Sequence, residues 1–175
     1  MEGDELSRRA RDLVVDDAAA ERARRGRRRA IADEVAGPVD VLVAAAERRL
    51  PVTVTLLGGQ RLSFVPTAVG TDVATGSLAG GPTDLVRVAA IAVLETPAEL
   101  RIDPDVESPG SLLHDLLAAI VDERPPVAIW TLDGGGPFTG DLIAAGADAL
   151  VLTVGPTGPR RLVPLRAVAR LRLAP

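Results

Sequence analysis

Arginine is the residue type that gives this 175-residue sequence most of its chemical potential. All 20 basic residues are arginine, and one cluster near the C-terminus contains Arg160, Arg161, Arg166 and Arg170. Strand periodicity in the last segment, RRLVPLRAVARLRL, sends the Val and Leu side chains toward a core and Arg166, Arg170 and Arg172 outward together. A guanidinium group binds a phosphate through two parallel hydrogen bonds, so this strip predicts contacts with a nucleic-acid backbone. The alternative is a solvated outer face, or arginines that pair with acids of a neighbouring subunit.

A second cluster lies near the N-terminus, where residues 22–29 (RARRGRRR) contain six arginines and no acid. Such a run predicts an arm that contacts nucleic acid. The arginines that we nominate for this contact are Arg24, Arg25, Arg27, Arg28 and Arg29. The alternative is a solvated helix whose arginines pair with the acids on both sides of the run.

The residue types that carry most enzymatic chemistry are scarce in this sequence. Cysteine is absent and His114 is the only histidine, which excludes thiolate metal sites, cysteine nucleophiles and histidine clusters. Residues 134–136 (GGG) lack the Lys-Ser/Thr that follows the glycines of a phosphate-binding loop, and they predict a hairpin turn. We therefore expect a non-catalytic protein with no cofactor and no bound metal. An enzyme of unrecognised type stays a further alternative.

Charge and hydropathy limit the partners that the chain can have. The net charge of −4 argues against a chain coated with nucleic acid, although residues 126–173 carry five arginines against three aspartates. No apolar run approaches the ~18–20 residues that a membrane span needs. The N-terminal stretch MEGDELSRRARDL has early acids and lacks the apolar region of a signal peptide. We expect a cytoplasmic protein with no membrane contact.

Two helical segments and two sets of short strands must position these residues. Helix formers dominate residues 4–35, and Gly37-Pro38 ends that segment. Apolar residues at helical spacing predict short helices at 39–49 and 111–123. Between and after these helices the period changes from 3.6 to 2, which predicts strands separated by glycine-rich turns. The acidic, proline-containing stretch 97–110 reads as a linker.

The two strand-rich segments are copies of one unit. Residues 43–54 (VAAAERRLPVTV) align with 118–129 (AAIVDERPPVAI), and 85–94 (LVRVAAIAVL) align with 162–171 (LVPLRAVARL). The offset between aligned residues stays between 75 and 77. Each unit is therefore a helix followed by about five short strands, an order that suits a small barrel with few exposed edges. The predicted divisions are 1–37, an Arg-rich helical segment; 38–96, the first barrel with its helix; 97–110, the linker; and 111–175, the second barrel with its helix.

This order of elements resembles the Sm-like (LSm) family, which includes bacterial Hfq. The stretch WTLDGGGPFTGDLIAAGADALVLTV is similar to the first motif of that family, and LVPLRAVARLRL is similar to its second. The ending VPLRAVARL also resembles uncharacterised actinobacterial proteins that end in VPLxAVAxL. The resemblance implies two five-stranded Sm-like barrels in tandem, and it covers the second unit better than the first.

Departures from the family pattern affect both binding and shape. The family reads bases with an Asn, a stacking side chain and a basic pair in the second motif. Here Asn is absent, and of the basic pair only Arg166 is basic. Trp130 is the one large aromatic that could stack a base, and a core or interface role is the alternative. In the first unit Phe64 replaces the glycine at the bend of the second strand, and Pro66 within that strand predicts a strand edge or a bulge.

Together these observations predict a nucleic-acid-binding module, with RNA favoured over DNA, that contacts the backbone and shows low base specificity. The alternative is a protein–protein scaffold or oligomeric assembly subunit that has lost RNA binding. The resemblance implies assembly by pairing of the fourth strand of one barrel with the fifth strand of the next, within a chain, between chains or both. Self-association through such edge strands could close three chains into a ring, and the N-terminal helix could instead hold two chains together.

Overall fold

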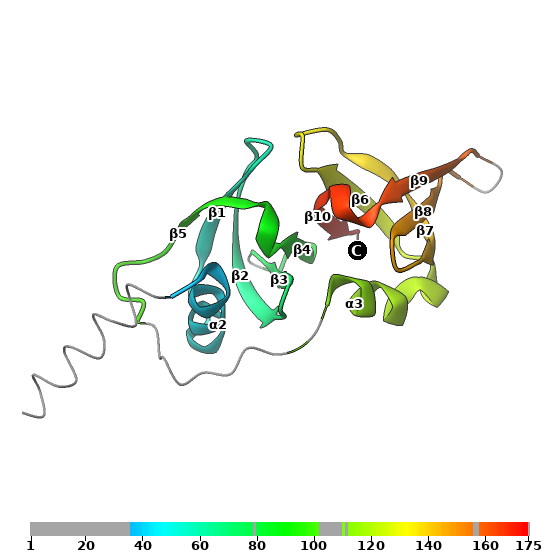
Figure 1. Ribbon diagram of the computed structural model, residues 1–175. Helices are drawn as coiled ribbons and strands as arrows, with labels where there is room; N and C mark the ends of the chain where they lie inside the picture. Colours follow the sequence, from blue (N-terminus) through cyan, green and yellow to red (C-terminus); the bar gives the residue numbers. More distant parts are fainter. Residues whose placement is uncertain (1–35, 79, 102–109, 111, 156–157, 175) are drawn as a thin grey trace, which may run out of the picture.

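The computed structural model describes residues 36–78, 80–101, 110, 112–155 and 158–174. These residues form one open ten-stranded antiparallel sheet with two α-helices, so the predicted mainly β class with flanking helices is confirmed (Figure 1). The predicted helical segment 4–35, with the nominated arginines Arg24, Arg25, Arg27, Arg28 and Arg29, lies outside the described residues. Most of the predicted linker lies outside them too.

The first half of the sheet begins with a helix and continues with five strands. Its elements are α2 (Pro38–Arg48), β1 (Val52–Leu56), β2 (Arg61–Val69), β3 (Val73–Ser77), β4 (Asp84–Arg87) and β5 (Ile91–Glu95). A single 3₁₀ turn, Val88–Ala90, separates β4 from β5. The predicted helix at 39–49 and the strands that follow it are thereby confirmed.

The second half repeats this series. Its elements are α3 (Leu113–Ile120), β6 (Pro126–Thr131), β7 (Phe138–Ala145), β8 (Ala149–Thr153), β9 (Arg160–Pro164) and β10 (Val168–Leu173). The 3₁₀ turn Leu165–Ala167 separates β9 from β10, as its counterpart does in the first half. The glycine run at 134–136 forms the turn between β6 and β7, as predicted.

Strand order shows that the two halves are structural copies. The order along the sheet is β5-β1-β2-β3-β4-β10-β6-β7-β8-β9, so each half places its own fifth strand beside its first. The register agrees: Glu95 pairs with Thr53 in the first half, and Arg172 pairs with Ala128 in the second. The internal repeat seen in the sequence is therefore a repeat of strand pairing, and β4 and β10 are the strands at which the copies meet.

Each helix covers the hydrophobic core of its own half, and both lie in the lower part of the view in Figure 1. Helix α2 begins with Pro38 at its first position, where the missing N–H removes no intrahelical hydrogen bond. The backbone N–H of Gly37 donates to the Asp40 carboxylate at 2.8 Å, which supports the same end. Helix α3 also depends on the first half, because the Leu113 N–H donates to the Asp72 carboxylate at 2.8 Å.

A bulge bends the second strand of each half at the same place. The pairing of β2 with β3 shifts between Pro66 and Ala68, and the pairing of β7 with β8 shifts between Leu142 and Ala144. Of the two alternatives predicted from Pro66, a strand edge or a bulge, the structure shows the bulge. Because β1 pairs with β2 only as far as Phe64, the missing N–H of Pro66 takes no hydrogen bond from that ladder.

Phe64 stands where the family pattern has a glycine, and a glycine on the neighbouring strand, Gly76 of β3, makes room for it. Phe64 is fully buried, and a β-carbon placed on Gly76 of β3 would overlap its ring and the Val65 carbonyl. In the second half the sizes are exchanged, because Gly140 of β7 occupies the Phe64 position and buried Leu152 of β8 occupies the Gly76 position. Each half therefore fills the same space with one large side chain and one glycine.

We expect Gly76→Leu to lower the free energy of unfolding by about 2 kcal/mol, because an added side chain in a packed core forces strain. Phe64→Gly alone should cost about 3 kcal/mol through the cavity that it leaves. The double variant copies the second half and should be more stable than either single variant. Urea unfolding followed by circular dichroism measures all three, and losses that simply add would show that the two positions do not share one space.

Candidate functional site

The ladder between β4 and β10 joins the two halves into one sheet. Leu171 of β10 lies opposite Leu85 of β4, with Arg170 opposite Val86 and Arg172 opposite Asp84. The Leu173 N–H continues the ladder by donating to the Thr83 carbonyl at 2.9 Å. We call this ladder the inner joint. It covers one edge of each half, and those edges would otherwise expose unpaired backbone groups.

A buried cluster of charges lies within the inner joint. The Asp84 carboxylate accepts a hydrogen bond from Arg170 Nε at 2.8 Å and two from Arg172, from Nε and Nη2, at 3.1 Å each. The Arg170 guanidinium also lies over the Trp130 ring, 4.3 Å from its centroid. Ion pairing and the cation–π contact compensate the loss of hydration that burial imposes on these charges.

The prediction that Arg170 faces outward as part of an open strip is wrong. Arg170 is only 7% exposed, because the Asp84 side chain of β4 and the Trp130 ring pack against its guanidinium group. Arg166 is exposed as predicted, but it lies on the 3₁₀ turn Leu165–Ala167, which interrupts the alternation of the strand. Periodicity distinguishes the two faces of a strand, but it does not say whether the second face is covered.

The hydrophobic core of each half includes residues that the other half contributes across the inner joint. Ala169 of β10 is buried in the core of the first half, while Val73 and Leu85 of the first half are buried in the core of the second. Arg87 adds a hydrogen bond from Nη1 to the Leu165 carbonyl at 3.1 Å. The halves are therefore packed into one another as well as hydrogen-bonded.

Two hairpin turns add a further contact between the halves. A β-carbon on Gly58, in the turn after β1, would overlap the backbone of Gly134, in the turn after β6. Gly134 itself has a φ of +86°, a conformation that favours glycine. Within the same turn Asp133 accepts hydrogen bonds from the Thr131 hydroxyl and the Gly135 N–H, which hold the pKa of Asp133 below its ordinary value. The glycines at these two turns permit the close approach of the halves.

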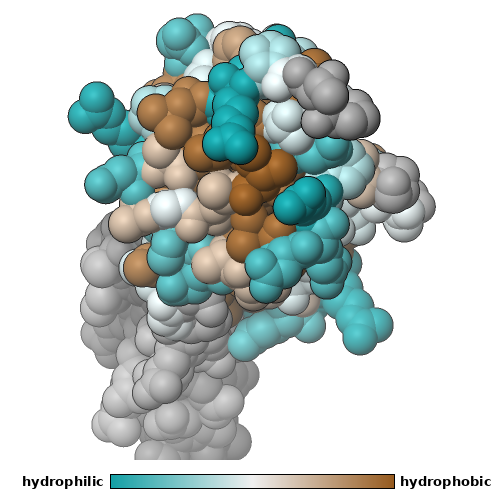
Figure 2. All heavy atoms as spheres, turned by 90° about the vertical axis from the view of Figure 1, so that its right-hand side faces the viewer, coloured by the Kyte–Doolittle hydropathy of each residue, from teal (hydrophilic) through white to brown (hydrophobic). Residues whose placement is uncertain are grey.

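Among the strands that the structure describes, two have a neighbour on one side only, β5 in the first half and β9 in the second. On β5 the side chains of Ala92, Val93 and Glu95 are exposed. On β9 Leu162 is 69% exposed, the highest value among the large hydrophobic residues described. Hydrophobic side chains gather among hydrophilic ones on the side of the molecule where β7, β8 and β9 lie (Figure 2).

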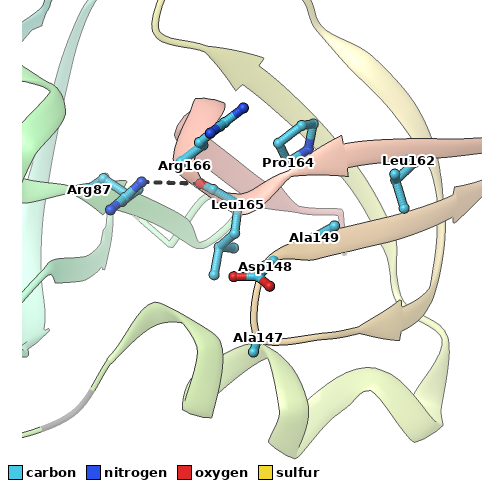
Figure 3. A pocket seen from close by; sticks show the side chains of 8 residues that line it. All are labelled: Arg87, Ala147, Asp148, Ala149, Leu162, Pro164, Leu165 and Arg166. Carbon is cyan, nitrogen blue, oxygen red and sulfur yellow. Dashed lines mark hydrogen bonds between the residues drawn. The ribbon is translucent and has the colours of Figure 1, made fainter.

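The remaining predicted arginines lie on or beside β9 and do not enclose a common site. Arg160 and Arg161 are exposed on the strand, and Arg166 is exposed on the following turn. Arg166 lines a pocket of about 500 Å³ together with Arg87, Asp148 and five smaller or apolar residues. In Figure 3 Arg166 points away from Asp148, with Leu165 between them. Of the four predicted C-terminal arginines, three are thus accessible and Arg170 is not.

Other kinds of site receive no support from the described residues. Within them, no three His, Asp or Glu side chains come together as a metal site would require. Neither described helix is long and apolar enough to cross a membrane. No family model and no curated protein matches this chain.

Sequence reasoning overlooked Asp84, the residue on which the inner joint centres. Its signal was present in the repeat, where Asp84 in TDLVRV aligns with Arg161 in RRLVPL. In the structure Asp84 meets Arg170 and Arg172 of β10, whereas Arg161 is exposed on β9.

We expect Asp84→Asn to lower the free energy of unfolding by about 3 kcal/mol, because two arginines then lack a counter-charge in a largely buried place. Asp148→Asn is the matched control: Asp148 is exposed, and its change should stay within about 0.5 kcal/mol. Urea unfolding compares both with the original chain. Equal stabilities of the two variants would mean that the Asp84 charge contributes nothing to the joint.

Proposed function

We propose that this protein is a self-assembling scaffold subunit whose free strands β5 and β9 pair head to tail with other copies of the chain. The observation that carries the proposal is the strand equivalence. In the repeat, β9 is the counterpart of β4 and β5 is the counterpart of β10, and β4 pairs with β10 inside the chain. One copy therefore presents at its two ends the two kinds of strand that pair at its centre.

Exposure at equivalent positions supports this pairing. Leu85 of β4 is 4% exposed, whereas its counterpart Leu162 of β9 is 69% exposed. On the other strand, Arg170 of β10 is buried, whereas its counterpart Val93 of β5 is 50% exposed. At these two pairs of positions, the residue that the inner joint covers has a counterpart that lies open at one end of the sheet. Covering Leu162 and Val93 removes apolar surface from water, which favours association.

A pocket beside β9 has the right position for the strand of a second copy. It has a volume of about 470 Å³ and is lined by Thr131, Phe138, Arg161, Leu162, Val163, Pro164 and Ala167. The corresponding place in the first half is closed, because Leu56, Leu62, Val86 and Ala90 pack there with Ala169 of β10. The counterpart of Ala169 is Ala92, which is exposed on β5. We infer that Ala92 of one copy enters this pocket of the next.

The strand order also supports the proposal that each half is an Sm-like five-stranded barrel. Two halves that pair through equivalent strands form a heterologous contact, in which different surfaces of the same chain meet. Contacts of this type continue from copy to copy and close into a ring when the rotation between copies permits. Three chains in such a ring would place six halves in a circle.

We expect Leu162→Glu to shift the chain toward monomers, because it puts a charge into the apolar contact between β9 and β5 of the next copy. Leu78→Glu is the matched control, since Leu78 is also exposed but lies in the turn between β3 and β4. Size-exclusion chromatography with light scattering, over a range of protein concentrations, measures the mass. An original chain that stays monomeric at every concentration would refute the assembly proposal.

A second proposal is that the chain binds the backbone of single-stranded RNA with low base specificity. It rests on the three exposed guanidinium groups of Arg160, Arg161 and Arg166, which lie within one stretch of the second half. Arginine forms paired hydrogen bonds with phosphate oxygens. The lack of Asn and the engagement of Trp130 with Arg170 leave the described residues few means of reading bases.

We expect this binding to weaken about twentyfold between 50 and 200 mM salt, the response for roughly three phosphate contacts on a single strand. Fluorescence anisotropy of a labelled single-stranded RNA, titrated with the chain at several salt concentrations, measures the slope. Arg160→Gln and Arg166→Gln together should reduce both the affinity and the slope. No binding at low salt, or binding insensitive to salt, would exclude this proposal.

A further inference from the structure

We propose that charges on the edge strands determine which strands pair when copies of the chain assemble. The acid and the base stand on opposite strands in the two joints, which are the inner joint and the joint between β9 of one copy and β5 of the next. This inference rests on the assembly proposed above and specifies its partner surface. In the inner joint the acid lies on β4, as Asp84, and the bases lie on β10, as Arg170 and Arg172. On the free strands the signs of the charges are reversed: β9, the counterpart of β4, carries the base Arg161, and β5, the counterpart of β10, carries the acid Glu95.

The register of the inner joint predicts the register between copies. Asp84 lies opposite Arg172, and Leu85 lies opposite Leu171. The counterparts of Asp84 and Arg172 are Arg161 and Glu95, as the pairings of β9 with β8 and of β5 with β1 show. Arg161 of one copy therefore lies opposite Glu95 of the next, and Leu162 lies opposite Leu94. Directly opposed residues of antiparallel strands are close enough for such an ion pair.

The same register makes the two wrong pairings unfavourable. If β5 of a second copy displaced β10 from β4, Glu95 would lie opposite Asp84. If β10 of a second copy paired with β9, Arg172 would lie opposite Arg161. Both arrangements oppose like charges, which destabilises a strand pair. The charges therefore favour the inner joint within a chain and the β9–β5 joint between chains, so that first and second halves alternate.

The joint between copies is the weaker of the two. The inner joint has one carboxylate shared by two arginines, and both arginines lie over the Trp130 ring. At the β5 end Val93 replaces Arg170, and Thr55 replaces Trp130 beneath it. Glu95 already pairs with Arg61 at the surface, where salt screens charges. Added salt should therefore separate copies from one another while each chain keeps its inner joint.

Reversal of single charges tests this rule. Arg161→Glu places an acid opposite Glu95 of the next copy, and Glu95→Arg places a base opposite Arg161. Each variant alone should associate about tenfold more weakly than the original chain, as expected when an attractive cross-strand pair becomes repulsive. An equimolar mixture of the two variants should regain the original mass, because each joint then opposes unlike charges. Sedimentation velocity measures the single variants and the mixture.

Arg160→Glu is the matched control. It makes the same charge change one residue away on β9, where the predicted register opposes it to uncharged Thr96. It should assemble as the original chain does. If the original chain assembles but the variants and their mixture behave like this control, the charge rule is wrong and the assembly proposal stands. If the original chain does not assemble, the assembly proposal itself fails. The rule is supported if each variant alone associates more weakly than the original chain and the equimolar mixture regains the original mass.

Discussion

The unpaired edge of a β-strand is the constraint on which the rest of this structure depends. Every strand at the end of a sheet exposes N–H and C=O groups, and five strands in one half leave two such edges. The chain covers one edge of each half by pairing β4 with β10. The interlocked cores, the glycine contact between the turns and the hydrogen bond from helix α3 to Asp72 all join the same two halves that this pairing joins.

The buried charges of the inner joint are better understood as a source of specificity than of stability. Removing the charges of Asp84 and Arg170 from water costs free energy, and a well-packed apolar pair in their place is often at least as stable. What an apolar pair cannot supply is discrimination between partners. In a chain that contains two copies of one unit, each strand edge meets two similar candidates, and a charge of defined sign distinguishes between them.

The sequence predicted the parts of the fold that local pattern determines. Helical spacing located α2 and α3, alternation and glycines located the strands, and Pro66 located a bulge. Local pattern could not predict that Arg170 is buried, because the residues that cover it, Asp84 and Trp130, are distant in sequence or on another strand. The exchange of Phe64 and Gly76 for Gly140 and Leu152 was hidden for the same reason, since it relates residues on neighbouring strands.

The two proposed functions compete for one residue, and assembly resolves the competition. Pairing between β9 and β5 of the next copy would engage Arg161 with Glu95, which removes it from contact with RNA. Arg160 points to the other face of the strand, and Arg166 lies on the turn beyond the ladder, so both stay accessible. Two arginines on one chain hold a phosphate backbone weakly. A ring repeats Arg160 and Arg166 at fixed spacing. Several weak contacts that are linked in this way bind far more tightly than one contact alone. In the assembled form, RNA would therefore contact Arg160 and Arg166 of several chains, whereas a single chain offers Arg161 as well.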